Sequence, residues 1–529
     1  MMDVDKKELK GLKPKFTDVS GYASLTGAAL RKRTRIICTI GPSCWSVEML
    51  GVLLEQGMNV ARLNFSHGDH ETHARTIARL KEALAKRPGM HCAVMLDTKG
   101  PEIRTGFFGP KLEGKKLELT AGQTLILTTD YTHKSDGTKL GITYEKLPQS
   151  VKPGNQILIA DGSLVLEVES ISGIEVACKV LNDAAIGERK NCNLPGVHVD
   201  LPVLQPKDIM DLQDFGVPQG VDYVAASFVQ SASDVHFIRK ILDQVGGQNV
   251  KIIPKIENQE GLDYFEEIVK ASDAIMVARG DLGMEIPPEK VFRAQKMMIS
   301  TCARLGKPVI VATQMLESMV SNPRPTRAEC SDVANAVLDG ADAVMLSGET
   351  AGGKFPKEAV AIMARTCVEA EEEFDFDTAY ERELKREKKL HTLSLVESTT
   401  AAAVQAARTA AARAIIIFAH TGGTAMLFAK YKCSIPIIVV TAHAAVARYC
   451  KGLVAGSTVL LLPDHKRYGY QHESGEDEGV MVTEAVKFAA SLGIVTCAED
   501  PICALHAYRI GAVKNVAMRF FEAGSALNS

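Results

Sequence analysis

The sequence lacks the cysteine pairs and the one-sided charge that mark several large classes of protein. Its 12 cysteines are scattered, with no C-x-x-C pair, so neither a disulfide framework nor a common zinc spacing is indicated. Reduced thiols in a cytosolic protein are the better interpretation. The formal net charge is only -3 and 24% of residues are charged, so we expect no nucleic acid among its partners.

Long apolar runs are also missing. No stretch approaches the roughly 18 apolar residues of a membrane helix. The sequence begins "MMDVDKKELKGLKPKF", which has no apolar segment of the kind found in signal peptides. We therefore expect a cytoplasmic protein with no membrane contact.

Two common nucleotide-binding motifs are absent as well. The sequence contains no G-x-x-x-x-G-K-[ST] and no G-x-G-x-x-G. If the protein binds a nucleotide, it does so without a Walker loop or a dinucleotide-binding turn.

What is present is a series of βα units. The length of 529 residues and the 46% hydrophobic content predict about three domains with large cores. Short runs rich in Val, Ile and Ala recur, each followed by a helical pattern, which is typical of a parallel sheet. Eight such runs predict a closed (β/α)₈ barrel. They are "RIICTI" (35–40), "MNVARLNF" (58–65), "HCAVMLD" (91–97), "VDYVAASF" (221–228), "KIIPKI" (251–256), "DAIMVA" (273–278), "PVIVAT" (308–313) and "DAVMLS" (342–347).

The spacing of the runs predicts the domain organisation. Residues 101–203 interrupt the series after the third run and show alternating strands with turn glycines, so we expect a small β domain hinged on the barrel. The charged run "EAEEEFDFDTAYERELKREKKL" predicts a solvated helix or linker at a boundary. Beyond it, "AIIIFAH", "IPIIVVTA", "TVLLL" and "NVAMRFF" predict an open α/β sheet. The predicted parts are an N-terminal segment (1–28), the barrel (29–100 and 204–385), the inserted domain (101–203) and a C-terminal α/β domain (386–529).

Charged and polar residues close the predicted barrel strands, where such barrels carry their chemistry. In "KIIPKIENQEG", Lys255 and Glu257 are two residues apart, so both side chains leave the same face of a strand. A buried ion pair would explain them, but Asp281 on the next strand offers a second carboxylate, so we expect the two charges to meet through a substrate rather than directly. Two converging carboxylates suit Mg²⁺ or Mn²⁺. Arg62 and Arg104 add positive charge, so we expect an anionic small-molecule substrate.

Two other motifs carry weaker signals. His67, His70 and His73 in "NFSHGDHETH" do not have the H-E-x-x-H spacing, so we do not expect a zinc site. "TGGT" at 421–424 lies between a strand and a helix, where backbone N–H groups could hold a phosphate, although an ordinary βα turn explains it equally well. "DTKGPEIR" at 97–104 reads as a turn and possible hinge at the edge of the insert.

Taken in order, these motifs closely resemble those of the pyruvate kinase family across the whole barrel. The matching segments are "CTIGPS", "NVARLNFSHG", "LDTKGPEIR", "NLPG", "ASFV", "KIEN", "VARGDLG", "ATQMLESM", "PTRAE" and "MLSGETA". The resemblance implies an α/β fold with a TIM barrel, an inserted small β-barrel that acts as a mobile lid, and a C-terminal open α/β domain that is regulatory. It implies transfer of a phosphoryl group from phosphoenolpyruvate to ADP, giving pyruvate and ATP in the last step of glycolysis.

The resemblance also implies roles for individual residues. Glu257 and Asp281 match the ligands of a divalent metal, Mg²⁺ or Mn²⁺, and Lys255 matches the lysine that stabilises the transferring phosphoryl group. Arg62 matches a phosphate-binding arginine. The resemblance places the substrate-binding turn at Ala278, Arg279, Gly280 and Asp281, and it places Thr313 and Ser347 on the proton-delivery side of the enolate.

It also implies a K⁺ site at Asn64, Ser66, Asp97 and Thr98, and Glu102 is typical of potassium-dependent members. The positions that match ADP-contacting residues are Pro42, Asn64, His67, Arg104 and Lys190.

The C-terminal domain departs from the family pattern. Gly423 stands where an Arg is common, the terminal segment lacks "GWRPG", and the acidic stretch "HESGEDEG" would repel a bisphosphate. We expect a phosphorylated allosteric effector to bind at Thr421, Gly422, Gly423 and Thr424, with fructose 1,6-bisphosphate not the strong activator. A homotetramer is implied by the resemblance alone.

Two other functions remain open on the residues. One is another barrel enzyme that stabilises pyruvate enolate on a Glu/Asp metal site, such as a carbon–carbon lyase or the phosphoenolpyruvate-handling domain of a dikinase. The other is a metabolite sensor that keeps the fold without turnover. Lys255, the K⁺ residues and the insert favour the kinase over the first, and the retained charged residues argue against the second.

Overall fold

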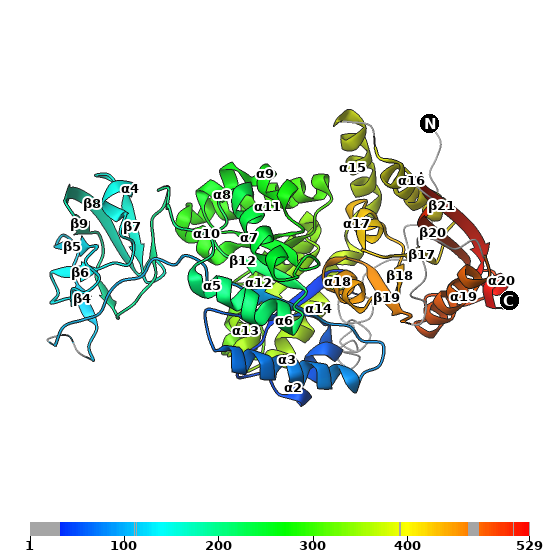
Figure 1. The fold of residues 1–529 in the computed structure, drawn as a ribbon, viewed down its shortest axis with the longest axis horizontal. Coiled ribbons are helices and arrows are strands. Elements are labelled where there is room, and N and C mark those ends of the chain that lie inside the picture. Colours follow the sequence, from blue (N-terminus) through cyan, green and yellow to red (C-terminus); the bar gives the residue numbers. More distant parts are fainter. Residues whose placement is uncertain are drawn as a thin grey trace.

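The computed structural model describes residues 32–110, 112, 114–390, 393–463, 475–510 and 513–527. Figure 1 shows three bodies in a row, with the inserted β domain at one end, a closed barrel in the middle and an α/β body at the other end. The predicted N-terminal segment 1–28 lies outside the described residues. Within the described part of the chain, no helix is both long and apolar enough to cross a bilayer.

All eight apolar runs form strands of one closed barrel, in the order β1-β16-β15-β14-β13-β12-β3-β2. Neighbouring strands are parallel throughout. Their side chains are buried on both faces, which explains the unbroken apolar runs in the sequence. The strands are β1 (Arg35–Thr39), β2 (Met58–Asn64), β3 (Ala93–Asp97), β12 (Tyr223–Ala226), β13 (Lys251–Ile256), β14 (Ile275–Ala278), β15 (Val309–Ala312) and β16 (Ala343–Leu346).

Helices follow the barrel strands and cover the outside of the barrel, where they share one large apolar core with the strands. Many of them begin at polar caps that the sequence supplies, such as Ser46, Asp69 and Thr326. They are α2 (Val47–Gln56), α3 (His70–Ala85), α5 (Pro206–Met210), the π-helix η3 (Asp211–Gly216), α6 (Val217–Gln219), α7 (Ala232–Gln244), α8 (Gln259–Asp263), α9 (Phe265–Ala271), α10 (Arg279–Glu285), α11 (Pro288–Leu305), the 3₁₀ turn η4 (Glu317–Val320), α12 (Arg327–Asp339), α13 (Gly348–Ala351) and α14 (Pro356–Glu372).

The insert between β3 and β12 is a β domain, as the alternating pattern predicts. It consists of a six-stranded sheet in the order β11-β7-β8-β9-β5-β6 and a two-stranded sheet β10-β4. Its core is separate from that of the barrel, because the buried apolar cluster contains only residues between Ile103 and Leu201. Its elements are β4 (Leu117–Leu119), β5 (Thr124–Thr128), β6 (Lys139–Gly141), α4 (Leu147–Ser150), β7 (Gln156–Ile159), β8 (Leu164–Ser172), β9 (Glu175–Val180), β10 (Ala184–Ile186) and β11 (Cys192–Asn193).

The C-terminal body is an open sheet in the order β19-β18-β17-β20-β21, with β21 antiparallel to β20. Strand β20 was not predicted from the sequence, because its alanines and cysteine give it a weaker apolar signal than its neighbours, although it pairs with β17. The elements are α16 (Leu395–Thr409), β17 (Ala414–Phe418), α17 (Gly423–Lys430), β18 (Ile437–Thr441), α18 (Ala444–Leu453), β19 (Ser457–Leu461), α19 (Gly475–Ser491), β20 (Pro501–Ile510), β21 (Val513–Glu522) and α20 (Ala523–Leu527).

Helix α18 joins the C-terminal body to the barrel (Figure 1). Leu453 and Tyr449 pack against the apolar core inside the barrel, and the Tyr223 hydroxyl donates a 2.9 Å hydrogen bond to the Tyr449 carbonyl. Asp222 accepts hydrogen bonds of 2.9 and 3.1 Å from Arg448. Since these contacts lie at the starts of the barrel strands, that end is closed and the strand ends face the insert.

The charged run after β16 is not fully solvated as predicted. It forms the end of α14 and the helix α15 (Phe376–Leu390), in which Glu383 and Glu387 are each only 1% exposed. Glu387 pairs with buried Lys430 of α17 at 3.1 Å. The run therefore connects the bodies through buried ion pairs as well as through solvated charges.

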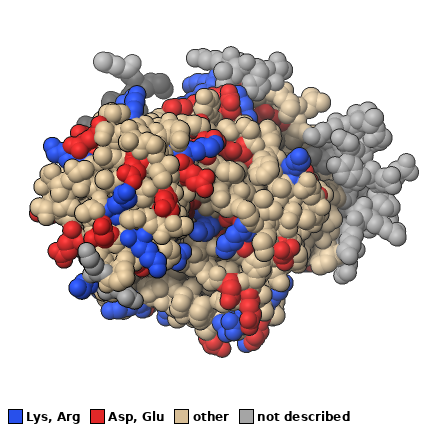
Figure 2. Space-filling view, turned by 60° about the vertical axis from the view of Figure 1, so that its left-hand side comes forward, with Lys and Arg blue, Asp and Glu red and all other residues tan. Residues whose placement is uncertain are grey.

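The surface charge is mixed. On the face in Figure 2, which brings the insert forward, Lys and Arg side chains alternate with Asp and Glu, and neither sign covers a large area. This distribution agrees with the small net charge of -3.

Candidate active site

Lys255 lies at the mouth of the barrel among oxygen atoms of three neighbouring strands. Its Nζ is 2.9 Å from Ser227 Oγ, 2.8 Å from Glu257 Oε1 and 3.4 Å from Asp97 Oδ1. Burial alone would lower the pKa of Lys255, but the charges of Asp97, Glu257 and Asp281 outweigh it and raise the pKa. The ammonium group is therefore held charged at the point where the barrel strands end.

The contact between Lys255 and Glu257 corrects one expectation. The recognition of Asp281 as a second carboxylate led us to expect that the two charges meet through a substrate, but in this structure they are in direct contact. The contact is an ion pair, and Glu257 Oε1 is buried with no further polar partner among the described residues. Glu257 Oε2 accepts a 2.6 Å hydrogen bond from the Phe228 N–H, and Phe228 has a φ of 55°. That unfavourable backbone angle aims the N–H at the carboxylate.

The carboxylates of this site fit a divalent cation. Burial and the negative charge of Asp281 together raise the pKa of Glu257 to about 7, although Lys255 and the Phe228 N–H lower it. Asp281 lies in the first turn of α10 and is partly exposed. A buried carboxylate beside a second carboxylate is the arrangement that an oxygen-preferring divalent cation neutralises, and Glu257 Oε1 has the Lys255 ammonium as its charged neighbour.

Arg62 and Asp97 form a second buried pair on the adjoining strands. Arg62 Nε donates a 2.6 Å hydrogen bond to Asp97 Oδ2, and Arg62 Nη1 donates one of 2.7 Å to Thr39 Oγ1. Thr98 Oγ1 accepts a hydrogen bond from the Ser227 N–H, and Ser227 Oγ donates one to the Thr98 carbonyl. Of the residues predicted to hold K⁺, Asp97 and Thr98 thus lie beside Lys255; Asn64 and Ser66 follow on β2 and the loop after it, where Asn64 Oδ1 accepts the Ser66 N–H.

The turn "ARGDLG" begins α10, and its side chains point in different directions. Arg279 makes a bidentate pair with Asp332 of α12, both contacts 2.7 Å, and donates to the Thr313 carbonyl at 2.8 Å. The Gly280 N–H donates a 2.7 Å hydrogen bond to Thr313 Oγ1. Thr313 has a φ of 69°, a strained value for a β-branched residue. The guanidinium of Arg279 is thus occupied by Asp332, so it positions the turn rather than facing the barrel mouth.

Ser347 closes the eighth strand. Its Oγ is buried and has no hydrogen-bond partner among the described residues. Its N–H donates a 2.6 Å hydrogen bond to Glu349, which also accepts the Leu316 N–H at 3.1 Å. The Ser347 hydroxyl can therefore bind a ligand or water. The fully buried Glu349 connects the loop after β15 with the loop after β16.

The residues predicted to contact a nucleotide lie on both sides of the barrel mouth. Pro42 and His67 are exposed on the loops after β1 and β2, and Lys190 is exposed on the insert. Arg104 donates hydrogen bonds to Glu102 at 2.8 and 2.9 Å and to the Arg189 carbonyl at 2.8 Å.

The histidines near this loop have protein partners. His70 Nε2 lies 2.7 Å from Asp211 of η3, and His73 Nε2 lies 2.9 Å from the His67 carbonyl. These contacts agree with a structural role for His70 and His73, which anchor the loop that carries His67.

The turn at 421–424 starts α17 in the C-terminal body. Gly422 has a φ of 82° and is buried, whereas Thr421 and Gly423 are exposed. A Cβ on Gly422 would lie 3.0 Å from Cys450 Sγ and from the Tyr449 ring, so the turn requires glycine for space as well as for its backbone angle. Part of the acidic stretch "HESGEDEG" lies outside the described residues, and the side chains of 475–478 are not described either.

Sequence reasoning missed several residues of the site. Asp332 holds Arg279 from 53 residues away, and Thr39 holds Arg62 from 23 residues away. No local pattern marks these partners, since each lies inside an ordinary helix or strand. Phe228 lies within the motif "ASFV", but only the structure shows that its positive φ directs its N–H to Glu257.

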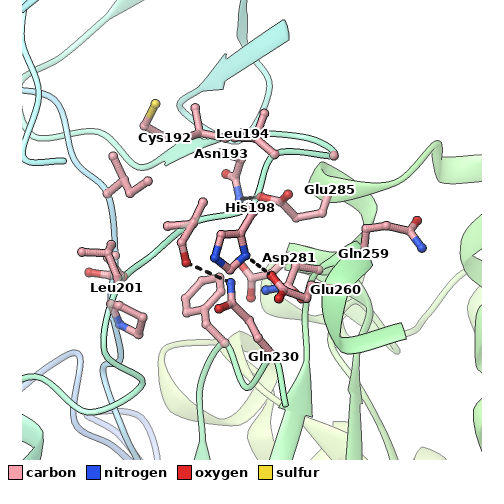
Figure 3. A pocket seen from close by; sticks show the side chains of 18 of the residues that line it. Cys192, Asn193, Leu194, His198, Leu201, Gln230, Gln259, Glu260, Asp281 and Glu285 are labelled. Atoms are coloured by element: carbon pink, nitrogen blue, oxygen red, sulfur yellow. Dashed lines mark hydrogen bonds and ion pairs between the residues drawn. The ribbon is translucent and has the colours of Figure 1, made fainter. Parts of the chain in front are cut away.

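A cavity of about 460 Å³ adjoins the site (Figure 3). It lies between the insert's return linker, residues 191–201, and the barrel, and it reaches the site at Asp281 and Phe228. His198 Nδ1 lies 2.6 Å from Glu260 Oε2 across it.

Comparisons with known proteins agree with this geometry. The family model described as "Pyruvate kinase, barrel domain" matches residues 31–360, and "Pyruvate kinase, alpha/beta domain" matches residues 397–517. Pyruvate kinase of Eimeria tenella is 51% identical over 475 residues, which is 90% of this chain and 86% of that protein. The cytosolic pyruvate kinase isozyme of Glycine max is 52% identical over 408 residues, covering 77% of this chain and 78% of that one.

A solved structure extends the likeness to three dimensions. The crystal structure of a pyruvate kinase from Cryptosporidium parvum has a TM-score of 0.87 and 45% identity, covering 94% of this chain and 97% of that chain. The predicted fold, with its eight-stranded barrel, additional sheets and C-terminal α/β body, is confirmed. The chain belongs to the pyruvate kinase family, an enzyme family.

Proposed function

We propose that this chain transfers the phosphoryl group of phosphoenolpyruvate to ADP, as the last step of glycolysis in the cytosol. The observation that carries the proposal is the charged Lys255 at the barrel mouth, with Glu257 and Asp281 beside it and Arg62 on the adjoining strand pair. Phosphoryl transfer depends on positioning and charge neutralisation, which these groups supply.

Glu257 and Asp281 would hold Mg²⁺ or Mn²⁺, which when bound supplies Lewis-acid charge neutralisation. Lys255 would stabilise the transferring phosphoryl group and the enolate oxygen that it leaves. Arg62 would bind the phosphate, and the backbone at Ala278, Arg279 and Gly280 would hold the substrate carboxylate. In this proposal Arg279 acts through its main chain, because Asp332 occupies its side chain.

The reaction balances with one proton taken up from the solvent. The bond between phosphorus and the enol oxygen of phosphoenolpyruvate breaks, and a bond forms between phosphorus and a terminal β-phosphate oxygen of ADP. The enolate left behind takes one proton at its CH₂ carbon and becomes pyruvate. Thr313 and Ser347 would orient the proton source, and the unpartnered Ser347 hydroxyl supports that role.

The remaining site residues complete the proposal. Asn64, Ser66, Asp97 and Thr98 would hold K⁺, with Glu102 alongside. Pro42, Asn64, His67, Arg104 and Lys190 would contact ADP. The insert, residues 101–203, would act as a lid that excludes water from the phosphoryl group.

The larger organisation is proposed on the resemblance. The chain would divide into a barrel at 29–100 and 204–385, a lid at 101–203 and a regulatory domain at 386–529, and it would form a homotetramer. A phosphorylated effector would bind at Thr421, Gly422, Gly423 and Thr424.

The test follows pyruvate in a mixture of the protein, phosphoenolpyruvate, ADP, Mg²⁺ and K⁺. We expect pyruvate and ATP in equal amounts, loss of turnover with a chelator, and recovery with added Mg²⁺ or Mn²⁺. Replacing K⁺ by a large organic cation should lower the rate. If no nucleotide or sugar phosphate condition yields pyruvate, the proposed activity is wrong.

A further inference from the structure

The short helix α10 contacts the catalytic residues at its N-terminal end. Arg279 is fixed by Asp332 and by the Thr313 carbonyl, and the Gly280 N–H is fixed by Thr313 Oγ1. Asp281 follows in the same turn, and Leu282 is fully buried. This half of the helix is therefore held on the barrel and presents the carboxylate of Asp281.

The other end of α10 contacts the lid. Glu285 Oε1 accepts a 2.9 Å hydrogen bond from Asn193 Nδ2 on the return linker, as Figure 3 shows. Burial raises the pKa of Glu285, while hydrogen bonds from Asn193 and from the Leu194 N–H lower it. The preceding residue, Met284, faces a hairpin of the lid, since a Cβ built on Gly162 would lie 3.5 Å from its Sδ.

Asn193 is attached to a rigid part of the lid. It lies on β11, which pairs with β7, the strand that leads into the hairpin at Gly162. In that hairpin, Asn191 Nδ2 donates a 2.7 Å hydrogen bond to Asp161 Oδ1, and the Asp161 N–H donates one to Asn191 Oδ1. The lid region that contacts α10 therefore moves as one piece with the lid sheet.

The other contacts of the return linker go to different elements. His198 pairs with Glu260 on α8 at 2.6 Å, and Gln230 donates a 3.2 Å hydrogen bond to the Val199 carbonyl. Neither α8 nor the loop of Gln230 contains a proposed metal ligand, and Glu257, which lies just before α8, is held by the Phe228 N–H and by Lys255 rather than by His198 or Val199. These contacts can hold the lid near the barrel without touching the helix of Asp281, so they provide a matched comparison.

We propose that Asn193 and Glu285 are positioning residues that couple the placement of the lid to the metal-binding carboxylate Asp281 through α10. Asp281 and Glu285 are four residues apart, so they lie on the same face of the helix, one turn from each other. The lid has its own core, so its position depends on contacts to the barrel such as this one. A shift of the lid sheet moves Asn193 and pulls on Glu285, and through one helical turn it displaces Asp281 against the contacts that hold Arg279 and Gly280 on the barrel. The inference depends on the proposed metal site.

Coupling between two sites is reciprocal. If lid placement changes the affinity of the Asp281 site for a divalent cation, the cation must change the placement of the lid by the same free energy. The contact should therefore influence metal binding in the absence of substrate and nucleotide.

The test measures Mn²⁺ binding to the full-length protein by electron paramagnetic resonance, without phosphoenolpyruvate or ADP. Asn193→Ala removes the neutral donor and touches no proposed ligand. We expect it to weaken Mn²⁺ binding by about 2- to 30-fold, the range for residues that modulate coupling from outside a site. His198→Ala, which removes the contact to α8, should leave the Kd within about 2-fold of wild type.

A double-mutant cycle assigns the effect to this hydrogen bond. In a Glu285→Ala background, Asn193→Ala should cause no further loss of Mn²⁺ affinity, because its partner is already gone. A second measurement uses hydrogen exchange in residues 191–201. Mn²⁺ should slow that exchange in wild type and in His198→Ala, and should slow it much less in Asn193→Ala.

The possible outcomes distinguish an error in the proposed coupling through α10 from an error in the proposed metal site. If wild type binds no Mn²⁺, the metal site itself is wrong. If wild type binds Mn²⁺ and Asn193→Ala binds it equally well, the coupling through α10 is wrong. If Asn193→Ala does not fold, Asn193→Ser takes its place. Its side chain is polar but shorter than that of Asn, so its hydroxyl does not reach Glu285, and we expect the same loss of Mn²⁺ affinity.

Discussion

Lys255 is surrounded by more negative charge than it can neutralise. Asp97, Glu257 and Asp281 all act on its ammonium group, and Arg62 is occupied by Asp97 and Thr39. An isolated structural ion pair needs one carboxylate, so the excess is best explained by a site that binds a cation together with an anionic substrate. At the scale of a residue, Lys255 is where the activity is most directly tested.

Lys255→Met should lower kcat for pyruvate formation by about 10² to 10³, the scale for loss of one preorganised electrostatic group. Lys251→Met serves as the control, because Lys251 lies on the same strand at the opposite end of the barrel, where it pairs with Asp273. Its kcat should stay within a few-fold of wild type. A Lys255→Met enzyme of nearly normal kcat would show that Lys255 is structural.

At the scale of an element, the start of α12 shows how a short motif holds the loop that follows a barrel strand. In "PTRAE", Glu329 accepts hydrogen bonds from the N–H groups of Thr326 and Ser318, both 2.7 Å, and from the Ser318 hydroxyl at 2.6 Å. It thereby joins the helix cap to η4, the turn that follows the Thr313 strand end. Burial raises the pKa of Glu329, but these hydrogen bonds outweigh it, so the net pKa is lowered from 4.5.

Glu329→Gln should weaken the η4–α12 junction by about 1 kcal/mol at pH 7, between the values for exposed ionic contacts and buried charge-assisted hydrogen bonds. Because the pKa of Glu329 is lower in the folded protein than in the unfolded chain, the extra stability is fully present above about pH 4.5. It is lost as the pH falls through the pKa of Glu329 in the folded protein. Hydrogen exchange of the Ser318 and Thr326 amides should therefore differ between the variants at pH 7, and the difference should shrink in acid. Glu317→Gln, at an exposed position of η4, should have no such effect; an equal effect would contradict the prediction.

At the scale of the whole molecule, α18 closes the barrel and joins it to the C-terminal body. Gly452 lies against the buried Tyr223, and a Cβ at that position would lie 2.4 Å from the Tyr223 hydroxyl. That hydroxyl donates a hydrogen bond to the Tyr449 carbonyl, which lies one turn before Gly452 in α18. The barrel and the C-terminal body therefore share a hydrogen bond next to the position that the new Cβ would occupy.

Gly452→Ala should destabilise this junction by about 1 to 3 kcal/mol, the usual cost of overpacking a filled core. Calorimetry should show a lower Tm than wild type. The matched control is Gly479→Ala on α19, where a Cβ would meet nothing within 4 Å, so the change should be neutral or stabilising by about 0.5 to 1 kcal/mol. A Gly452→Ala protein with unchanged Tm would mean that the two bodies separate easily at this point.

The effector proposal also belongs to the whole molecule, since it links the C-terminal body to the barrel. In the proposed site, the hydroxyls of Thr421 and Thr424 would contact one phosphate, and Gly423 has no charged side chain that could hold a second. In saturation kinetics with phosphoenolpyruvate, we expect sugar monophosphates to activate at least as well as fructose 1,6-bisphosphate. Large activation by the bisphosphate alone would contradict this.

Much of the fold and part of the site could be predicted because their signals are local. Each barrel strand is a short apolar run, and parallel strands all end at one rim, so the residues that close the runs must gather there. That reasoning was enough to bring Lys255, Glu257 and Asp281 to one place. β20 was missed because its alanines leave little apolar contrast, and its burial comes from pairing with β17.

By itself, therefore, the sequence determined the barrel, the inserted β domain and the rim on which the charged residues lie. Only the tertiary structure decided how those residues are partnered: Lys255 directly against Glu257, Arg279 turned toward Asp332, and Asn193 of the inserted domain against Glu285. The physical reason is the separation along the chain between the residues that interact. Strand and helix patterns repeat within a few residues, whereas Asn193 and Glu285 are 92 residues apart and meet only because the insert folds back onto the barrel.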